Sequence, residues 1–238
     1  MIDAADASPT PAVLVRDLRF AWPRQAPLLD IAALDVAAGE RLLLSGPSGS
    51  GKSTLLGLVT GILSGASGEC RVLGENMVTL SPEARDRLRA DRLGYIFQSF
   101  NLVPYLSVLD NVLLPCRLSA RRAAAAGQPR EAARALLASL GLEAARFRSK
   151  VTDLSVGQQQ RVAAARALIG APDLIIADEP TSALDEPRKH AFLDLLLAEA
   201  GKAGAAVLFV SHDPTLADRF DREIRLADIN AAFAGEPA

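Results

Sequence analysis

The chain has 238 residues, of which 50% are hydrophobic and 23% are charged, a balance typical of one large globular domain that excludes a largely disordered chain. Lys and Arg number 26 against 28 Asp and Glu, so the net charge of −2 lacks the basic excess typical of nucleic-acid binding, and we expect no nucleic-acid partner. No apolar run approaches the roughly 18 residues of a membrane-spanning helix, and the acidic first residues lack the basic and apolar parts of a signal peptide, so we expect a cytoplasmic protein.

The first quarter of the chain predicts two strands, then a buried strand and a helix. The first ten residues are small and polar and predict a frayed end. Residues 13–20 alternate between apolar and polar side chains, as a half-exposed strand does, and a second apolar stretch follows around residues 31–36. The short apolar run 41–45 predicts a buried parallel strand, and residues 53–60 predict the helix that follows it.

The rest of the chain alternates strands and helices with one interruption. Ser81 followed by a proline and an acid is a helix-start signature. Residues 101–150 are rich in Ala, Leu and Arg and predict an inserted helical region. The runs 174–177 and 206–210 predict further buried strands, separated by a helix over 187–200. This pattern predicts an α/β domain with a mainly parallel sheet.

The strongest local pattern is a glycine-rich loop between the buried strand and the first helix. It matches G-x-x-x-x-G-K-S/T, in which backbone N–H groups surround an anion and the next helix adds its positive end. Lys52 would reach the β- and γ-phosphates, and the Ser53 hydroxyl would bind Mg²⁺. The expected nucleotide contacts are Gly46, Pro47, Ser48, Gly49, Ser50, Gly51, Lys52, Ser53 and Thr54. The alternative is a tight turn without a ligand.

Two carboxylates end the strand over 174–177. Ligands bind at the carboxyl ends of strands in open α/β sheets, so we expect Asp178 and Glu179 at the same edge as the glycine-rich loop. Asp178 would take the metal side, because Mg²⁺ prefers carboxylate and phosphate oxygens. Glu179 would act as the general base on water. A helix cap beside a surface acid is the alternative.

Two further polar residues follow short strand-like runs. Gln98 follows residues 94–97, and its amide is suited to metal-bound water; an ordinary loop residue is the alternative. His212 follows the strand 206–210 and would hydrogen-bond a γ-phosphate or the attacking water. We expect His190, on the helix over 187–200, to be a surface residue.

The start of the helix over 154–170 has two interpretations. Ser155 is a natural N-cap, which needs no ligand. A second anion site is the other interpretation, because an exposed helix start with a hydroxyl and a flexible backbone binds phosphate well. The residue chemistry alone leaves both open.

Taken in chain order, these motifs resemble the ATP-binding subunit of an ABC (ATP-binding cassette) transporter. The resemblance implies ATP hydrolysis with Mg²⁺ in a head-to-tail homodimer, with each ATP between the phosphate loop of one copy and the 154–158 signature of the other. The signature residues Ser155, Gly157 and Gln158 thereby become nucleotide contacts, and Gln98 joins Ser53 and Asp178 as a metal ligand. Trp22 stands where the family places an aromatic against adenine; a core tryptophan is the alternative.

The resemblance narrows to the MacB/LolD/FtsE-like branch on three segments: residues 97–104, residues 109–112 and Gln159-Gln160-Arg161. That branch implies a separate four-helix permease with a large external domain, and a place on the cytoplasmic face of the inner membrane. The implied fold is a P-loop NTPase core with a mainly parallel sheet, an N-terminal antiparallel β subdomain and an inserted helical subdomain. We therefore expect one nucleotide-binding domain over residues 1–238, with the helical subdomain at about 99–165.

Val156 departs from the family, which usually has glycine at this position. Because a β-branched residue cannot take a glycine-only backbone cheaply, we expect Val156 to tune the closed dimer or its hydrolysis rate.

The competing functions are an ABC-type protein acting on nucleic acid or ribosomes, and a P-loop kinase or GTPase. The first class carries two cassettes or a coiled coil, and a GTPase carries an Asn-Lys-x-Asp element, none of which we find. We expect the arginines of residues 85–92 and 121–122 to be solvated helix faces.

Overall fold

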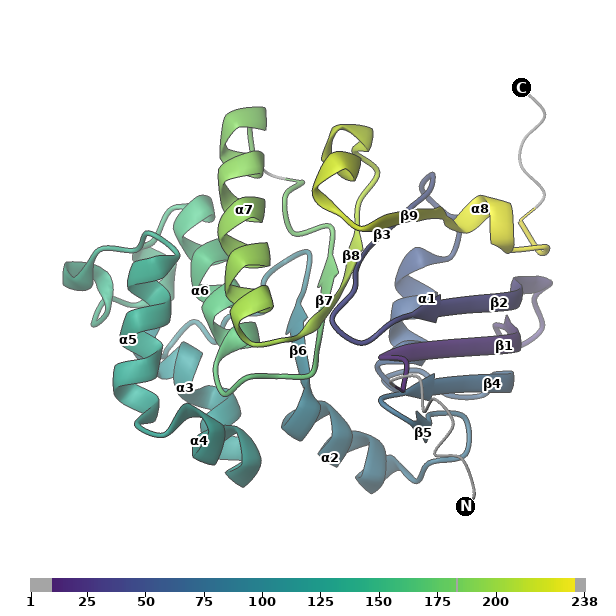
Figure 1. The fold of residues 1–238 in the computed structure, drawn as a ribbon, viewed down its shortest axis with the longest axis horizontal. Helices are drawn as coiled ribbons and strands as arrows, with labels where there is room; N and C mark the ends of the chain where they lie inside the picture. The colour runs from purple at the N-terminus through teal and green to yellow at the C-terminus, as the bar shows by residue number, and fades with distance from the viewer. Residues whose placement is uncertain (1–9, 183, 234–238) are drawn as a thin grey trace, which may run out of the picture.

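The computed structural model describes residues 10–182 and 184–233 (Figure 1). Residues 1–9, which make up most of the expected frayed end, lie outside this part. A five-stranded parallel sheet is central, in the order β6-β7-β8-β3-β9. Its strands are β3 (Arg41–Ser45), β6 (Leu93–Ile96), β7 (Leu174–Asp178), β8 (Ala206–Val210) and β9 (Arg222–Arg225). The predicted mainly parallel sheet is confirmed.

A second sheet is antiparallel, with the order β2-β1-β4-β5. Its strands are β1 (Val13–Ala21), β2 (Pro27–Val36), β4 (Ser67–Val72) and β5 (Glu75–Asn76). This is the N-terminal β subdomain that the resemblance predicted. No local pattern in the sequence predicts β4, which pairs with β1 across an irregularity in register, where a Cβ on Gly68 would lie 2.1 Å from the Asp17 carbonyl oxygen. Gly68 and Asp17 both have positive φ there, at 89° and 47°.

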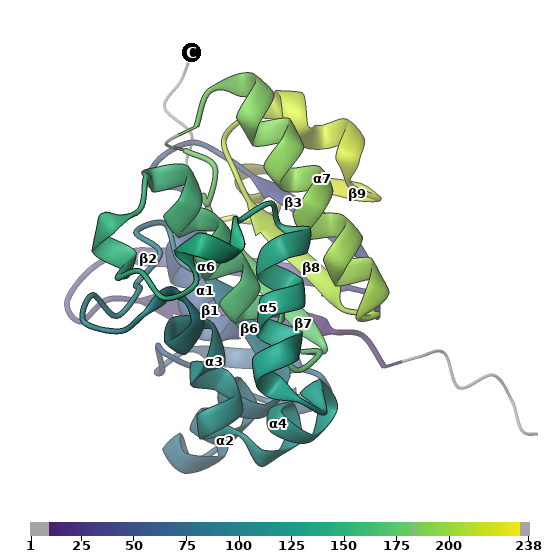
Figure 2. The same cartoon turned by 90° about the vertical axis from the view of Figure 1, so that its left-hand side faces the viewer.

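The helices lie on both sides of the parallel sheet (Figures 1 and 2). Helix α1 (Lys52–Val59) lies beside the antiparallel sheet, and α2 (Pro82–Arg92) precedes β6. The far side carries α3 (Val108–Leu118), α4 (Ala120–Ala126), α5 (Pro129–Ser139), α6 (Val156–Leu168) and α7 (Glu186–Lys202). Helix α8 (Leu226–Ile229) follows β9, and short 3₁₀ turns cover Ala144–Arg146, Val151–Asp153 and Pro214–Arg219. None of the helices in the described ranges has the length and apolarity that a bilayer crossing demands.

The core is divided by the parallel sheet, because successive side chains of a strand point to opposite faces. Leu43 of β3, Ile175 of β7 and Phe209 of β8 pack with the helices on the α3–α7 side. Leu42 and Leu208 pack with α1 and the antiparallel sheet. The helices of residues 108–168 thus share a core with one face of the sheet, and the limits 99–165 of a helical subdomain stay a prediction.

One predicted surface arginine is in the core. Arg121 is exposed as expected, but Arg122 is only 2% exposed. Its guanidinium donates to the carbonyl oxygens of Leu93 (2.9 Å), Ala167 (2.6 Å) and Ile169 (2.8 Å). Burial lowers the pKa of Arg122 to about 10. Arg122 therefore binds the carbonyl end of α6 and the start of β6, and its expected place on a solvated face is wrong.

Candidate active site

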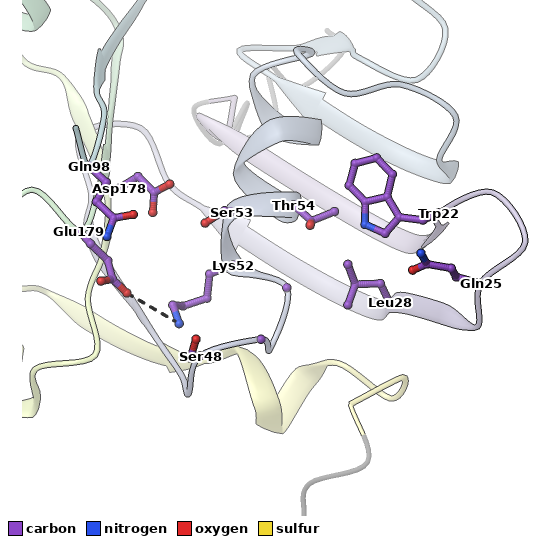
Figure 3. A pocket seen from close by; sticks show the side chains of 12 residues that line it. Trp22, Gln25, Leu28, Ser48, Lys52, Ser53, Thr54, Gln98, Asp178 and Glu179 are labelled. Atoms are coloured by element: carbon purple, nitrogen blue, oxygen red, sulfur yellow. Dashed lines mark ion pairs between the residues drawn. The ribbon is translucent and has the colours of Figure 1, made fainter. Parts of the chain in front are cut away.

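A pocket of about 510 Å³ opens where β3, β6 and β7 end, at the carboxyl edge of the parallel sheet (Figure 3). Its lining residues are Trp22, Gln25, Leu28, Ser48, Gly49, Gly51, Lys52, Ser53, Thr54, Gln98, Asp178 and Glu179. Gln98, Asp178 and Glu179 lie on one side of Ser53 and Lys52, and Trp22 lies on the other. Three motifs that are far apart in the sequence therefore meet in one cavity.

The backbone of the glycine-rich loop is shaped for an anion. Gly46, Gly49 and Gly51 have φ values of 154°, 80° and 98°, in the region that favours glycine. Gly51 is the N-cap of α1 and offers no side-chain cap, so no capping side chain takes the first N–H groups of that helix. A Cβ on Gly51 would lie 2.7 Å from the Leu29 Cδ2 atom. The loop thus fits phosphate groups, which accept from such N–H donors.

Two buried side chains of the loop add to this fit. The Lys52 ammonium group donates to the carbonyl oxygens of Gly46 (2.7 Å) and Pro47 (2.9 Å), and it lies 4.0 Å from the Glu179 Oε1 atom. The buried Ser50 hydroxyl finds no hydrogen-bond partner among the described residues. Lys52 lines the pocket, whereas Gly46, Pro47 and Ser50 are not among its lining residues.

Asp178 and Ser53 are brought together, as the metal prediction requires. Burial is the main cause that raises the pKa of Asp178, and the Glu179 charge adds to it, whereas the Ser53 hydrogen bond and the Lys52 charge lower that pKa. No cluster of three His, Cys, Asp or Glu side chains suits a metal within residues 10–182 and 184–233. A hydroxyl, a carboxylate and the Gln98 amide form the sparse oxygen set that Mg²⁺ uses together with phosphates and water.

Glu179 has a strained backbone and a fixed side chain. Its φ is +44°, a region that non-glycine residues rarely adopt, and its N–H donates to the Val210 carbonyl oxygen at 3.0 Å. The Glu179 Oε2 atom lies 3.3 Å from the His212 Nδ1 atom. His212 itself is exposed and does not line the pocket. The carboxylate thus lies between a lysine and an imidazole, at the lining of the pocket.

Trp22 is not a core tryptophan. It is 39% exposed and meets the Phe20 ring edge-on, at 5.1 Å between centroids. Its neighbours in the pocket, Gln25 and Leu28, belong to no motif, and no sequence pattern points to them. His190, expected at the surface, is half-buried and lies outside the pocket.

The signature residues lie away from the pocket, at the start of α6. The Ser155 hydroxyl accepts from the Gln158 N–H at 3.4 Å, and the Gln158 Oε1 atom accepts from the Ser155 N–H at 3.0 Å. The capping interpretation is therefore realised in this chain. Because both side chains act only as acceptors in this capping box, the Ser155 O–H and the Gln158 amide N–H groups remain free to donate.

Val156 needs no glycine backbone. It is the first residue of α6, and it is not among the described non-glycine residues with positive φ. The expected backbone strain is therefore absent. Its side chain is instead 50% exposed at the helix start.

The chain is similar to known proteins along most of its length. A family profile described as ABC transporter matches residues 29–182. The uncharacterized ABC transporter ATP-binding protein YbbA of Escherichia coli K12 is 44% identical over 195 residues, covering 82% of this chain and 84% of YbbA. The lipoprotein-releasing system ATP-binding protein LolD of Anaeromyxobacter dehalogenans is 42% identical over 227 residues, 94% of each chain.

The solved structures show the same fold. The dimeric ABC transporter cassette MJ0796 matches with a TM-score of 0.78 at 32% identity, covering 90% of this chain and 93% of that one. A second structure of MJ0796 is a dimeric post-hydrolysis state bound to ADP and Pi.

Proposed function

The chain belongs to the ABC transporter family, in its branch of LolD-like and MacB-like ATP-binding proteins, and is an ATP-hydrolysing subunit. From this premise we propose that it binds ATP with Mg²⁺ at the glycine-rich loop and pairs head to tail with a second copy. Hydrolysis would then drive a separate membrane permease of the MacB/LolD type, in export, lipoprotein or lipid extraction, or mechanotransmission. Its place would be the cytoplasmic face of the inner membrane.

One observation carries the dimer proposal: the two phosphate-binding elements of one chain lie apart. The pocket contains Lys52, Asp178 and Glu179, whereas Ser155 and Gly157 start another helix outside it. The Gly157 N–H is one of the first-turn donors that have no partner within a helix. Each chain thus carries two different half-sites. When two copies pair about a two-fold axis, the glycine-rich loop of each copy meets the start of α6 of the other, and two complete sites form.

The roles of the side chains follow from their places. Lys52 would bind the β- and γ-phosphates, and Trp22 would stack on adenine. Ser53, Asp178 and Gln98 would hold Mg²⁺, which neutralises phosphate charge when bound. Glu179 would take a proton from the attacking water, with His212 orienting the carboxylate at 3.3 Å.

An apolar groove of about 370 Å³ is the proposed contact with the permease. Its apolar lining includes Tyr95, Phe97, Leu114, Pro115 and Leu118. Phe97 directly precedes Gln98, so a segment docked there would touch the chain beside the pocket. Leu118 is 76% exposed, and we expect Leu118→Asp to abolish stimulation of hydrolysis by the permease while basal hydrolysis is kept.

Complementation between two inactive variants tests the shared site. Lys52→Ala damages the phosphate loop, and Gly157→Asp places a negative charge on the signature; a Cβ there meets only Leu184 Cδ2, at 3.8 Å, so the variant can fold. A homodimer of either variant has two damaged sites. A mixed dimer has one doubly damaged and one intact site, so an equal mixture should regain up to about a quarter of the wild-type rate. A mixture no more active than its components would contradict the proposal.

A further inference from the structure

The loop that follows Gln98 has an unusual backbone. Phe100 and Asn101 are consecutive non-glycine residues with φ values of 61° and 46°. Such residues persist in the left-handed region only where their surroundings hold them. Something outside the loop must therefore stabilise this geometry.

Besides the burial of the Phe100 ring in the core, the group that holds this backbone from outside is an arginine of α6. The Arg166 Nη2 atom donates to the Phe100 carbonyl oxygen at 2.6 Å, and its Nη1 atom donates to the Asn101 carbonyl oxygen at 2.7 Å. Burial lowers the pKa of Arg166. No carboxylate of the described residues forms an ion pair with it. The partly buried Arg166 guanidinium group thus donates its side-chain hydrogen bonds to the carbonyl groups of these two strained residues.

The same residues set the position of Gln98. The Phe100 N–H donates to the Phe97 carbonyl oxygen at 2.9 Å, which closes a turn with Gln98 and Ser99 at its corners. Gln98 reaches the pocket from this turn. A shift of Phe100 therefore turns the Gln98 side chain relative to Asp178.

We propose that Arg166 is a positioning residue for hydrolysis: it ties the signature helix α6 to the Gln98 turn and so fixes Gln98 in the pocket. The link spans the helix, because Arg166 lies ten residues after Val156, about 15 Å along α6. One helix thus presents Ser155 and Gly157 at its start and sets Gln98 near its end. This inference rests on the proposed function of Gln98.

A double-mutant cycle on the purified full chain tests the proposal. We expect Arg166→Gln to lower kcat by about 10- to 100-fold, the loss typical of a misplaced group, with little change in the KM for ATP. Trp22 is the single tryptophan of the chain and lines the pocket, so its fluorescence reports nucleotide binding separately from turnover. Because Arg166 acts through Gln98, the double variant Gln98→Ala with Arg166→Gln should be no slower than Gln98→Ala alone.

Arg161 supplies the matched control. It lies on the same helix, and its Nη1 atom donates to the Gly141 carbonyl oxygen at 2.6 Å, but it has no bond to the Gln98 turn. Arg161→Gln should leave kcat unchanged, and Arg166→Lys, which keeps the charge, should recover part of the rate. If Arg166→Gln does not fold, the cycle is run with Arg166→Lys.

Two results would overturn the role of Arg166. One is a double variant whose loss in kcat is the product of the losses in Gln98→Ala and Arg166→Gln; the other is a loss in Arg161→Gln as large as that in Arg166→Gln. Failure of the proposed function would instead appear in the wild-type protein, as hydrolysis that needs no second copy.

Discussion

Glu179→Gln separates proton transfer from nucleotide binding. Glutamine has the length of glutamate, and its oxygen can still accept from His212, so the contact at 3.3 Å is preserved. The variant removes the negative charge and, with it, the ability to take a proton from water. General-base catalysis contributes about 10²- to 10⁴-fold, so we expect the barrier of hydrolysis to rise by about 2.7 to 5.5 kcal/mol.

ATP binding should respond in the opposite direction. The Glu179 carboxylate lies 4.0 Å from the Lys52 ammonium group and competes with the phosphates for it. At that distance the attraction is about 1 kcal/mol in water and about 4 kcal/mol at an effective dielectric constant of 20. Without the charge, ATP should bind at least as tightly, and a dimer loaded with unhydrolysed ATP should accumulate.

Phosphate release, Trp22 fluorescence and size-exclusion chromatography with ATP measure these three effects. Lys52→Ala is the contrasting variant, because it should weaken nucleotide binding itself. Glu186→Gln, at an exposed position at the start of α7, is the control for loss of a carboxylate. Near wild-type turnover in Glu179→Gln would refute the role of Glu179 as the base.

Three further predictions concern dimer closure, core stability and pH. Val156→Gly should change ATP-driven dimerisation or the hydrolysis rate by about fivefold, because covering the exposed half of a valine is worth about 1 kcal/mol; no change in either would refute a role for Val156. Arg122→Gln should lower the free energy of unfolding in urea by about 2–4 kcal/mol, since it leaves buried carbonyl groups unpaired, whereas the exposed Arg121→Gln should cost at most about 1 kcal/mol; equal losses would contradict this. The Lys189 hydrogen bond holds the pKa of Asp213 at about 2, below its usual 3.8, so the stability that this contact adds is complete above pH 3.8 and is lost as the pH falls toward about 2. Lys189→Met should remove that part of the pH dependence of urea unfolding, and an unchanged profile would exclude it.

The elements that the sequence predicted well are those whose pattern is local. The apolar runs that became β7 and β8 are short, and each is followed by a polar residue at the sheet edge, Asp178 and Ser211 respectively. The glycine-rich loop combines residue type, spacing and context within eight positions. The local patterns around Gln98 and His212 were weak. Both residues were predicted to belong to the site only because the whole set of motifs occurs in the order typical of the family.

What the sequence did not reveal depends on contacts between distant segments. Gly68 is required because β4 pairs with β1 directly against the Asp17 carbonyl group, which no local pattern records. The local sequence places Arg122 on a charged helix face. Only the folded structure shows that carbonyl groups at the end of α6 accept hydrogen bonds from it. The Phe100 backbone likewise depends on Arg166, which is 66 residues away.

We propose that one copy of this chain holds only half of each hydrolytic site. The most direct test is the rate of ATP hydrolysis per molecule, measured across a dilution series with the oligomeric state followed in the same samples by analytical ultracentrifugation. We expect the rate per molecule to fall as the dimer dissociates and to become negligible for the monomer. A constant rate per molecule in samples that sediment as monomer would contradict it.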